Sequence, residues 1–368
     1  MPNSTNNKIV EPGGTVGILG GGQLGRMLTL AAARLGLKCH IFAPEADSPA
    51  FQVAAAHTLA AYDDANALEK FAQVVDVITY EFENIPAQTV TLLSSLRDVR
   101  PSARALDLLQ DRFVEKKFMH NLGIETATFA PVDSEASART AFGTIGAPSI
   151  LKTSTLGYDG KGQRRVAGAD ECVAAWQALG KTRCILEGFV DFKRELSVVA
   201  ARGSDGAFQC YDLVENIHEN HVLRTTLAPA ADAARLTARA TEIARSITHA
   251  LSYVGVMAVE LFETRDGRLL VNEIAPRVHN SGHWTIDACA VSQFEQHIRA
   301  VCGWPLGDPT RHADAIMRNL LGDDVLAWQT HARDPQTSIH LYGKSAPRPG
   351  RKMGHITRLF PLNKRPSA

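Results

Sequence analysis

The segment Met257-Ala-Val-Glu-Leu-Phe-Glu-Thr-Arg-Asp-Gly-Arg-Leu-Leu-Val-Asn-Glu-Ile274 decides how the middle of this chain folds. Its Asp-Gly pair lies between two apolar runs, which is a strong signal for a β-hairpin with a two-residue turn. With Asp266 and Gly267 in the turn, counting outward along both strands places Glu260 directly opposite Glu273. Two carboxylates that face each other in a half-buried sheet repel. A divalent cation would replace this repulsion with coordination, and Mg²⁺ prefers one or two carboxylates plus phosphate oxygens.

An alternative register of the same hairpin stays open. A slip of one residue would send the two glutamates to opposite faces of the sheet. Asn272, which precedes Glu273, should point to the other face unless the strand bulges there. The spacing favours the metal-binding register.

The N-terminal part of the chain has the pattern of a parallel sheet. Apolar strands are expected at 15–20, 38–43 and 74–80, with a helix at 26–35 after the first strand. Strands that alternate with helices predict a doubly wound, Rossmann-like α/β domain, which we place at residues 15–111.

The loop Gly20-Gly-Gly-Gln-Leu-Gly25 joins the first strand to its helix and has the G-x-G-x-x-G spacing of a dinucleotide site. Such a site also needs an acid about 20 residues further on, to hold the ribose. That place holds Phe42-Ala43-Pro44, with Glu45 and Asp47 only nearby. The alternative is a tight turn that packs the helix on the sheet, and NAD binding is the weaker interpretation.

The remainder of the chain has a different pattern. We expect a long charged helix at 104–121, and antiparallel strands near 149–155, 163–167, 183–190, 195–201, 254–263 and 268–275. This mixture predicts an α+β domain at 112–311, followed by a small C-terminal domain at 312–368. Residues 1–14 are rich in Asn, Ser, Thr, Pro and Gly and are expected to form a disordered tail.

A second glycine loop, Gly157-Tyr-Asp-Gly-Lys-Gly-Gln163, follows an apolar run that ends at Lys152. It is not a P-loop, because Gln163 stands where that motif needs Lys. Three glycines with Asp159 and Lys161 still indicate a mobile backbone that could close over phosphates, with Lys152 as a charge for them. A solvent-exposed hairpin turn is the alternative, about as well supported by the local features.

Two polar clusters lie nearer the C-terminus. The run Arg277-Val-His-Asn-Ser-Gly-His-Trp284 directly follows the second acidic strand. A local basic group would suit a phosphomonoester, since Arg binds phosphate through two parallel hydrogen bonds; its members are Lys344, Arg348, Arg351 and Lys352. On their own, these cations are better explained as a solvated surface, and His218 and His221 as ordinary loop residues.

The overall composition excludes several classes of protein. Lys plus Arg and Asp plus Glu each number 39 among 368 residues, so the net charge is zero. This balance argues against electrostatic binding to nucleic acid or to an anionic membrane. The apolar runs are shorter than the about 18 residues that span a bilayer. Six widely spaced cysteines indicate neither a disulfide framework nor a zinc site, and we expect a reduced, cytoplasmic protein.

Taken together, five motifs resemble the ATP-grasp superfamily and, within it, the N5-carboxyaminoimidazole ribonucleotide synthase family. They are Gly20–Gly25, Tyr80-Glu-Phe-Glu-Asn-Ile85, Gly157–Gln163, Arg277–Trp284 and His340-Leu-Tyr-Gly-Lys344. The resemblance runs from about residue 15 to the end, and its last three motifs are specific in combination. It implies an N-terminal α/β domain, an ATP-grasp domain and a small C-terminal domain.

The resemblance also implies which residues bind ATP and metal. Residues expected around ATP are Arg112, Lys152, Gly157, Tyr158, Asp159, Gly160, Lys161, Gly162, Gln163, Glu187, Gly188, Phe189, Val190, Glu195, His218, Asn272 and Glu273. Glu187 to Val190 would be the hinge against adenine, and Glu195 would accept the ribose hydroxyls. Glu260 and Glu273, with Asn272, would hold Mg²⁺, for which Mn²⁺ could substitute.

For 5-aminoimidazole ribonucleotide, the resemblance implies binding by Gln23, Leu24, Glu81, Glu83, Tyr158, Asp159, Lys161, Arg277, His279, Asn280, Lys344 and Arg351. The expected catalytic residues are Asp159, Lys161, Arg277 and His279, with Asp159 and His279 both candidates for the general base. Lys161 departs from the family pattern, where many relatives carry Arg.

The implied reaction is the ATP- and bicarbonate-dependent carboxylation of the ribonucleotide's exocyclic amine, by way of carboxyphosphate, in purine biosynthesis. The partners are then these small molecules, and the family resemblance suggests a homodimer. Two alternatives remain. One is another ATP-grasp ligase, such as a formate-dependent glycinamide ribonucleotide transformylase. The other is an NAD-binding oxidoreductase that uses the first glycine loop.

Overall fold

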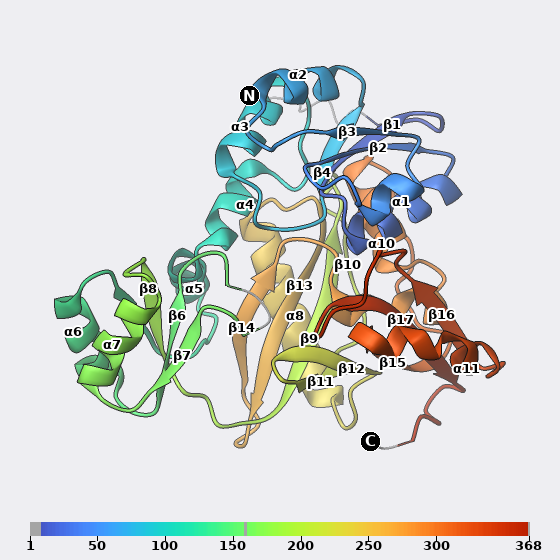
Figure 1. The fold of residues 1–368 in the computed structure, drawn as a ribbon. Coiled ribbons are helices and arrows are strands. Elements are labelled where there is room, and N and C mark those ends of the chain that lie inside the picture. Colours follow the sequence, from blue (N-terminus) through green and yellow to red (C-terminus); the bar gives the residue numbers. More distant parts are fainter. Residues whose placement is uncertain (1–8, 158–159, 367–368) are drawn as a thin grey trace.

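The N-terminal unit is a parallel four-stranded sheet in the order β3-β2-β1-β4 (Figure 1). In this computed structural model, residues 9–157 and 160–366 are described. The strands are β1 (Thr15–Leu19), β2 (Lys38–Ala43), β3 (Ala56–Leu59) and β4 (Val77–Tyr80). The helical elements of this unit are α1 (Gln23–Arg34), η1 (Pro49–Gln52), α2 (Ala65–Gln73) and α3 (Ala87–Leu96). The expected doubly wound α/β arrangement is confirmed.

A small antiparallel sheet in the order β5-β8-β6-β7 forms a separate lobe, at the left of Figure 1. Its strands are β5 (Phe129–Val132), β6 (Ser149–Thr153), β7 (Gln163–Val166) and β8 (Cys184–Gly188). The helices α6 (Glu135–Ile145) and α7 (Ala169–Ala178) pack on it and share its apolar core. The second glycine loop connects β6 to β7, and therefore lies at the edge of this lobe.

The third sheet is the largest, in the order β14-β13-β9-β11-β12-β15-β17-β16, with β10 pairing β9. Its first strands are β9 (Phe192–Arg202), β10 (Phe208–Cys210), β11 (Val214–Glu219), β12 (Val222–Ala228), β13 (Gly255–Thr264) and β14 (Leu269–Ala275). The remaining strands are β15 (Asp314–Leu321), β16 (Thr337–Leu341) and β17 (Lys352–Phe360). The expected boundary at residue 312 falls just before β15, which continues the same sheet; the domain limits stay a prediction.

Helices cover this sheet and join it to the N-terminal unit. α8 (Ala234–Ala250) shares a core with β9, β13 and β14. α10 (Gln293–Val301) contacts β13 and also α1, so one apolar core is continuous between the two sheets. Shorter helices are η2 (Asn280–Gly282), α9 (Thr285–Ala288), η3 (Gly322–Ala327) and α11 (Trp328–Ala332). Within the described ranges, the helices all fall short of the length and apolarity that a membrane span needs.

The long helix expected at 104–121 is two helices, α4 (Ala103–Gln110) and α5 (Arg112–Asn121). Asp111 separates them with an extended backbone, and its carboxylate accepts hydrogen bonds from the amides of Phe113 and Val114. The prediction was wrong because an Asp inside a helical pattern acts here as an N-cap. The break starts α5 at Arg112, whose amide donates to the carbonyl of Ser154 in the small lobe.

The expectation of a disordered tail is wrong for residues 9–14. Val10 is buried, its amide donates to the carbonyl of Cys302, and its own carbonyl accepts from the Trp304 indole at 2.7 Å. Composition alone missed these contacts because their partners lie at the opposite end of the chain. Residues 1–8 lie outside the described residues.

The acidic hairpin has the predicted pairing of Glu260 with Glu273, but reaches it by another path. The amide of Thr264 donates to the carbonyl of Arg268, so three residues form the loop instead of two. Gly267 takes the left-handed conformation that such a loop needs, with φ +78°. The extra loop residue shifts the register by one, and a bulge between Glu260 and Leu261 shifts it back. Asn272 needed a bulge to point to the same face of the sheet as Glu273, and this bulge is present.

The first glycine loop binds a carboxylate of this same chain. Glu81, at the end of β4, accepts from the amide of Gly22 at 2.5 Å and from that of Gly25 at 2.8 Å. These amides are the donors that would hold a phosphate at the N-terminus of α1. A Cβ atom on Gly22 would lie 2.5 Å from Glu81 Oε1, so the close approach requires glycine. The loop is thus closed by a carboxyl group of the same chain, which favours the tight-turn interpretation over a dinucleotide site.

We expect Gly22→Ala to lower the free energy of unfolding by about 1–3 kcal/mol, the usual effect of forcing an extra methyl group into a packed site. Gly22 has φ −75°, which alanine also adopts, so the loss should come from the clash with Glu81. In a Glu81→Ala background the same substitution should cost less than about 1 kcal/mol. Urea denaturation of the four proteins measures this coupling.

Gly143→Ala is the matched control, because Gly143 lies inside α6 and a Cβ there would meet nothing within 4 Å. That substitution should leave stability unchanged or raise it by up to about 1 kcal/mol. Equal losses for Gly22→Ala in the two backgrounds would contradict the assigned constraint.

Candidate active site

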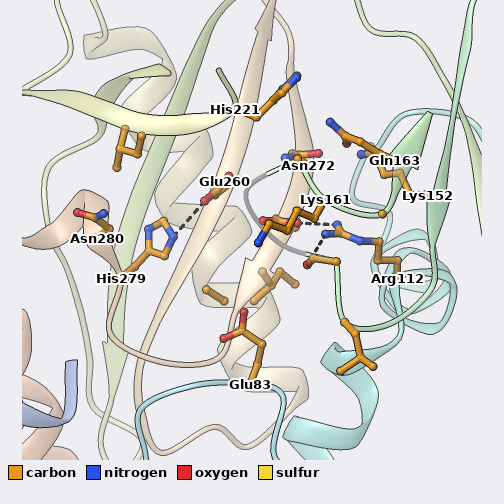
Figure 2. Close-up of a pocket in the computed structure, with 18 of the residues that line it drawn as sticks. Glu83, Arg112, Lys152, Lys161, Gln163, His221, Glu260, Asn272, His279 and Asn280 are labelled. Atoms are coloured by element: carbon orange, nitrogen blue, oxygen red, sulfur yellow. Dashed lines mark hydrogen bonds and ion pairs between the residues drawn. The ribbon is translucent and has the colours of Figure 1, made fainter. Parts of the chain in front are cut away.

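A cavity of about 880 Å³ lies where the three sheets meet, and Figure 2 shows part of its lining. The edge of the N-terminal sheet, the small lobe and the large sheet all contribute side chains. It brings together most of the residues predicted for the site: Gln23, Leu24, Glu81, Glu83, Arg112, Lys152, Gly157, Gly160, Lys161, Gly162, Gln163, Phe189, Glu195, His218, Glu260, Asn272, Glu273, Arg277, His279 and Asn280.

Each carboxylate of the acidic pair has one nitrogen partner, a guanidinium for Glu273 and an imidazole for Glu260. Glu273 accepts from Arg112 Nη1 at 2.5 Å, and Glu260 Oε1 lies 3.1 Å from His279 Nε2 (Figure 2). Burial would raise the pKa of Glu260, but the hydrogen bond and charge of His279 outweigh it and hold that pKa at about 2. The like-charge repulsion expected from the sequence is therefore balanced by residues from α5 and from the loop after β14.

The same hairpin offers oxygen atoms that suit a hard divalent cation. Among the described residues, the buried Oδ1 of Asn272 has no hydrogen-bond partner. The bulge brings Asn272 into the cavity lining, which also includes Glu260 and Glu273; Figure 2 labels Asn272 and Glu260. Two carboxylates and an unpartnered amide oxygen fit the donor set that Mg²⁺ prefers.

A buried lysine connects the small lobe to this hairpin. Lys116 on α5 is 1% exposed; its Nζ lies 3.4 Å from Glu187 Oε1 and donates to the carbonyl of Asn272 at 3.1 Å. Glu187 also accepts from Lys152 Nζ at 2.8 Å. Burial would raise the pKa of Glu187, but the two lysines lower it to about 2. Glu187 thus orients Lys152 at the cavity wall.

At the edge of the N-terminal sheet, Glu83 and Arg277 form a paired contact. Arg277 Nη2 donates to Glu83 Oε1 at 2.9 Å, and Arg277 Nε donates to the other carboxylate oxygen. Burial would raise the pKa of Glu83, but Arg277 lowers it to about 2. In the same region both polar atoms of the Asn280 side chain are buried, and the described chain supplies neither with a partner. Unsatisfied buried groups that face a cavity are suited to bind a ligand.

The second glycine loop packs against a histidine of the large sheet. A Cβ on Gly160 would lie 2.6 Å from His221, so glycine is required there, and Gly160 has φ +76°. Lys161 points into the cavity near Arg112 (Figure 2). Tyr158 and Asp159, both predicted site residues, lie outside the described residues.

His218 and Glu195 form a pair on neighbouring strands. Their Nδ1 and Oε1 atoms are 3.3 Å apart. Burial would lower the pKa of His218, but the hydrogen bond and the charge of Glu195 raise it overall. The pair lines the cavity on the side of β11, as a nucleotide contact requires.

Some predicted residues lie outside the cavity lining. Glu187 is buried behind Lys152, and Gly188 and Val190 border a second, shallower pocket beside Phe189. Lys344 donates to the carbonyl of Lys352, and Arg351 to that of Ala346. Burial and the neighbouring Arg351 lower the pKa of Lys344 to about 8, so the basic group is compact and partly desolvated.

The sequence analysis missed several residues of the site. The lining includes Glu115 and Asn216, and Lys116 lies directly behind it; Lys352, predicted only as part of the basic group, lines the cavity as well. Glu115 and Lys116 follow Arg112 by three and four positions, the spacing that places residues on one helix face. Their charge concealed them, because charged residues are usually exposed.

Three family models match consecutive parts of the chain. They describe a Ribonucleotide synthetase preATP-grasp domain at residues 14–110, an ATP-grasp domain at 117–294, and a Phosphoribosylaminoimidazole carboxylase C-terminal domain at 315–363.

Relatives of known name are similar over nearly the whole length. The N5-carboxyaminoimidazole ribonucleotide synthase of Brucella melitensis is 51% identical over 354 residues, which cover 96% of this chain and 98% of that protein. The Bacillus subtilis protein of the same name is 41% identical, with 96% and 93% covered.

Solved structures agree in fold. An ADP complex of N5-carboxyaminoimidazole ribonucleotide synthetase has a TM-score of 0.92 at 40% identity, covering 96% of this chain and 94% of that one. N5-carboxyaminoimidazole synthase from Aspergillus clavatus, in complex with ADP and 5-aminoimidazole ribonucleotide, has a TM-score of 0.88 at 33% identity, covering 95% and 94%.

Glu115 should make stability depend on pH. It is 2% exposed and accepts from the amide of Ile274 at 2.6 Å, and burial raises its pKa from 4.5 to about 8. Between these two values the folded protein holds a proton that the unfolded chain has lost, so this contribution to stability falls as pH rises. Glu115→Gln keeps the acceptor and removes the titration. From pH 5 to 8, its free energy of unfolding relative to wild type should rise by about 1.4 kcal/mol per pH unit.

Urea denaturation at several pH values measures this difference. Glu171→Gln, at an exposed position in α7, is the control and should follow the wild-type pH profile. Parallel profiles for wild type and Glu115→Gln would contradict the assignment of a buried proton to Glu115.

Proposed function

This chain belongs to the N5-carboxyaminoimidazole ribonucleotide synthase family of ATP-grasp ligases, and we propose that its three-sheet cavity performs that family's reaction with the residues described above. The protein is an ATP-dependent ligase of purine biosynthesis. The resemblance seen in the sequence motifs is thereby confirmed. The observation that carries the proposal is one cavity that joins the basic glycine-loop lobe to the Glu83–Arg277 pair.

ATP would bind on the small-lobe side of the cavity. Lys152 and Arg112 would contact its phosphates, with the 157–163 loop closing over them. The hinge at 187–190 would face adenine, and Glu195 with His218 would contact the ribose. The short Lys152–Glu187 bond supports this assignment, because it fixes the lysine at the cavity wall.

Magnesium would be held by Glu260, Glu273 and the unpartnered oxygen of Asn272. When bound, it would neutralise the charge that develops on the transferred phosphoryl group. Arg112 and His279, which now contact the two carboxylates, would then be available for the phosphates and the substrate.

The ribonucleotide would occupy the side of the cavity formed by the N-terminal sheet. In open α/β sheets, ligands bind beyond the carboxyl ends of the strands, and Glu81 and Glu83 follow β4 directly. Arg277, His279 and Asn280 face the same space, and the two unsatisfied atoms of Asn280 support a polar ligand there. Lys344 and Arg351 would bind the 5′-phosphate.

The reaction needs two transfers in one closed site. Bicarbonate attacks the γ-phosphorus of ATP, the bond to ADP breaks, and carboxyphosphate forms with a good leaving group. The exocyclic amine then attacks the carboxyl carbon, directly or after CO₂ is released, and inorganic phosphate departs. The amine proton passes to a base, for which His279 and Asp159 are the candidates. Water would hydrolyse the intermediate, so loop closure protects it.

A homodimeric state and a cytoplasmic location are further proposals, and both rest on family membership alone. The dinucleotide alternative loses its main support, because Glu81 already holds the amides that a pyrophosphate would need.

The first test is ATP hydrolysis with Mg²⁺ and bicarbonate, in the presence and absence of 5-aminoimidazole ribonucleotide. We expect strong stimulation by the ribonucleotide, with N5-carboxyaminoimidazole ribonucleotide detected by mass spectrometry. Stimulation only by another amine or carboxylate would retain the ATP half and remove the proposed acceptor. Absence of ATP hydrolysis under every condition would contradict the whole proposal.

The metal assignment is tested in the same assay with Glu273→Gln. Loss of one magnesium ligand should reduce ATP turnover at least about 100-fold, as expected when transition-state charge is less well compensated. Glu242→Gln is the control, since Glu242 pairs with Arg239 on the exposed face of α8. Normal turnover by a folded Glu273→Gln variant would remove Glu273 from the site.

We expect Lys344→Ala to raise KM for the ribonucleotide about 10- to 100-fold with little change in kcat. A hydrogen bond from a charged donor to a phosphate contributes about 1.5–3 kcal/mol, and uniform binding appears in KM. Steady-state kinetics measure both constants, with Lys364→Ala at an exposed position as the control. An unchanged KM would detach Lys344 from the 5′-phosphate.

A further inference from the structure

A cluster of one carboxylate and two imidazoles lies outside the lining of the active-site cavity. Asp287 comes from α9, His340 from β16 and His355 from β17. One ligand atom from each of the three side chains lies within 4.8 Å of the other two. His340 and His355 are cross-strand partners, and their ring centroids stack 4.4 Å apart with an interplanar angle of 13°, so the partly exposed His340 ring must turn about its side-chain torsions before both nitrogens face one ion.

His355 has an unsatisfied nitrogen in this cluster. The residue is 0% exposed, and its Nδ1 lies 2.8 Å from the hydroxyl of Tyr342. Its Nε2 is buried and finds no hydrogen-bond partner anywhere in residues 9–157 and 160–366. Leaving a buried polar atom unpaired costs about 1–3 kcal/mol, so such an atom in a native fold calls for a partner that the chain itself does not supply.

The other two side chains leave a route to solvent. His340 Nε2 lies 3.0 Å from Asp287 Oδ2, and the two side chains are 26% and 13% exposed. A ligand could therefore enter past them and reach His355 at the buried end. His283, whose ring lies 4.7 Å from that of His355, closes the inner side.

We propose that Asp287, His340 and His355 form a binding site for a divalent transition-metal ion of the Zn²⁺ class. Two imidazoles and one carboxylate are a common zinc donor set, and the solvent side leaves a fourth position for water. Imidazole ligands select Zn²⁺ and its neighbours over Mg²⁺, which prefers oxygen. The site therefore differs in chemistry from the carboxylates at the centre of the cavity.

The arrangement of Tyr342 supports this assignment. A metal-binding histidine usually donates its second ring N–H to a neighbouring acceptor, which fixes its tautomer. If His355 Nδ1–H donates to the Tyr342 hydroxyl, the lone pair of Nε2 is free for the metal.

The site would fix three segments relative to one another. α9 follows the loop that carries His279 and Asn280, while β16 runs toward Lys344, and β17 begins at Lys352. A metal bound between α9, β16 and β17 would hold these substrate-facing segments in place without touching the substrate. The metal-binding claim itself is independent of the proposed activity.

The test uses the untagged full-length chain, treated with a chelator, dialysed and titrated with Zn²⁺ in the presence of excess Mg²⁺. Calorimetry should report one tight site per chain. Titration with Co²⁺ should give the visible absorption of a low-symmetry imidazole site. Neither readout requires turnover, so failure here is distinguishable from failure of the proposed enzyme activity.

Variants locate the metal. His340→Gln and Asp287→Asn, both at partly exposed positions, each remove a ligand and should weaken Zn²⁺ binding more than about 100-fold. Tyr342→Phe removes the hydroxyl that contacts His355 Nδ1 and should weaken Zn²⁺ binding about 10- to 100-fold. His249→Gln, on the exposed end of α8, and Glu273→Gln should leave it unchanged. Circular dichroism checks that each variant is folded. Absence of a tight site in the wild type, or equal affinity in wild type, His340→Gln and Asp287→Asn, would overturn the proposal.

Discussion

Two carboxylates that face each other across β13 and β14 impose the main electrostatic constraint on this molecule. Glu260 and Glu273 cannot share a half-buried sheet unless positive charge is brought to them. Arg112 at the start of α5 supplies it to Glu273, and His279 in the loop after β14 gives Glu260 a polar partner. Behind them, Lys116 ties the same hairpin to the small lobe. The charges that hold the lobes together are therefore also those a phosphate-bearing ligand would use.

Much of the fold could be predicted because it depends on local signals. Apolar runs located β1, β2 and β4 of the N-terminal sheet but not β3, and the Asp-Gly turn located the acidic hairpin. The predicted pairing of Glu260 with Glu273 is confirmed, although it was reached through a two-residue turn that the structure replaces with a three-residue loop and a bulge. The extra loop residue shifts the strand register by one residue, and the bulge shifts it back by one, so the two differences from the predicted hairpin cancel. The break at Asp111 and the packing of Val10 depended on contacts that no local pattern reveals.

Site residues that belong to short sequence motifs could be predicted. Site residues that reach the cavity only because tertiary packing buries them could not. Residues of the second glycine loop and of the run after β14 line the cavity as expected. Glu115 and Lys116 escaped notice because a charged helix face resembles a solvated one until tertiary packing covers it. The role of Glu81 was equally hidden, since its partners are backbone amides some 60 residues earlier. Assignments that concern substrate contacts remain proposals.

Helix α10 packs between the N-terminal sheet and the large third sheet, and this packing has a consequence for folding during translation. The core around β1 and α1 includes Phe294 and Ile298, and the amide of Val10 donates to the carbonyl of Cys302. During translation one apolar face of the N-terminal sheet therefore stays uncovered until nearly the whole chain has left the ribosome. Residues near the start of the chain and residues of α10 therefore form one apolar core. A nascent chain stalled before α10 would expose this apolar face to solvent. Chaperones that recognise apolar segments would be expected to bind it at that stage.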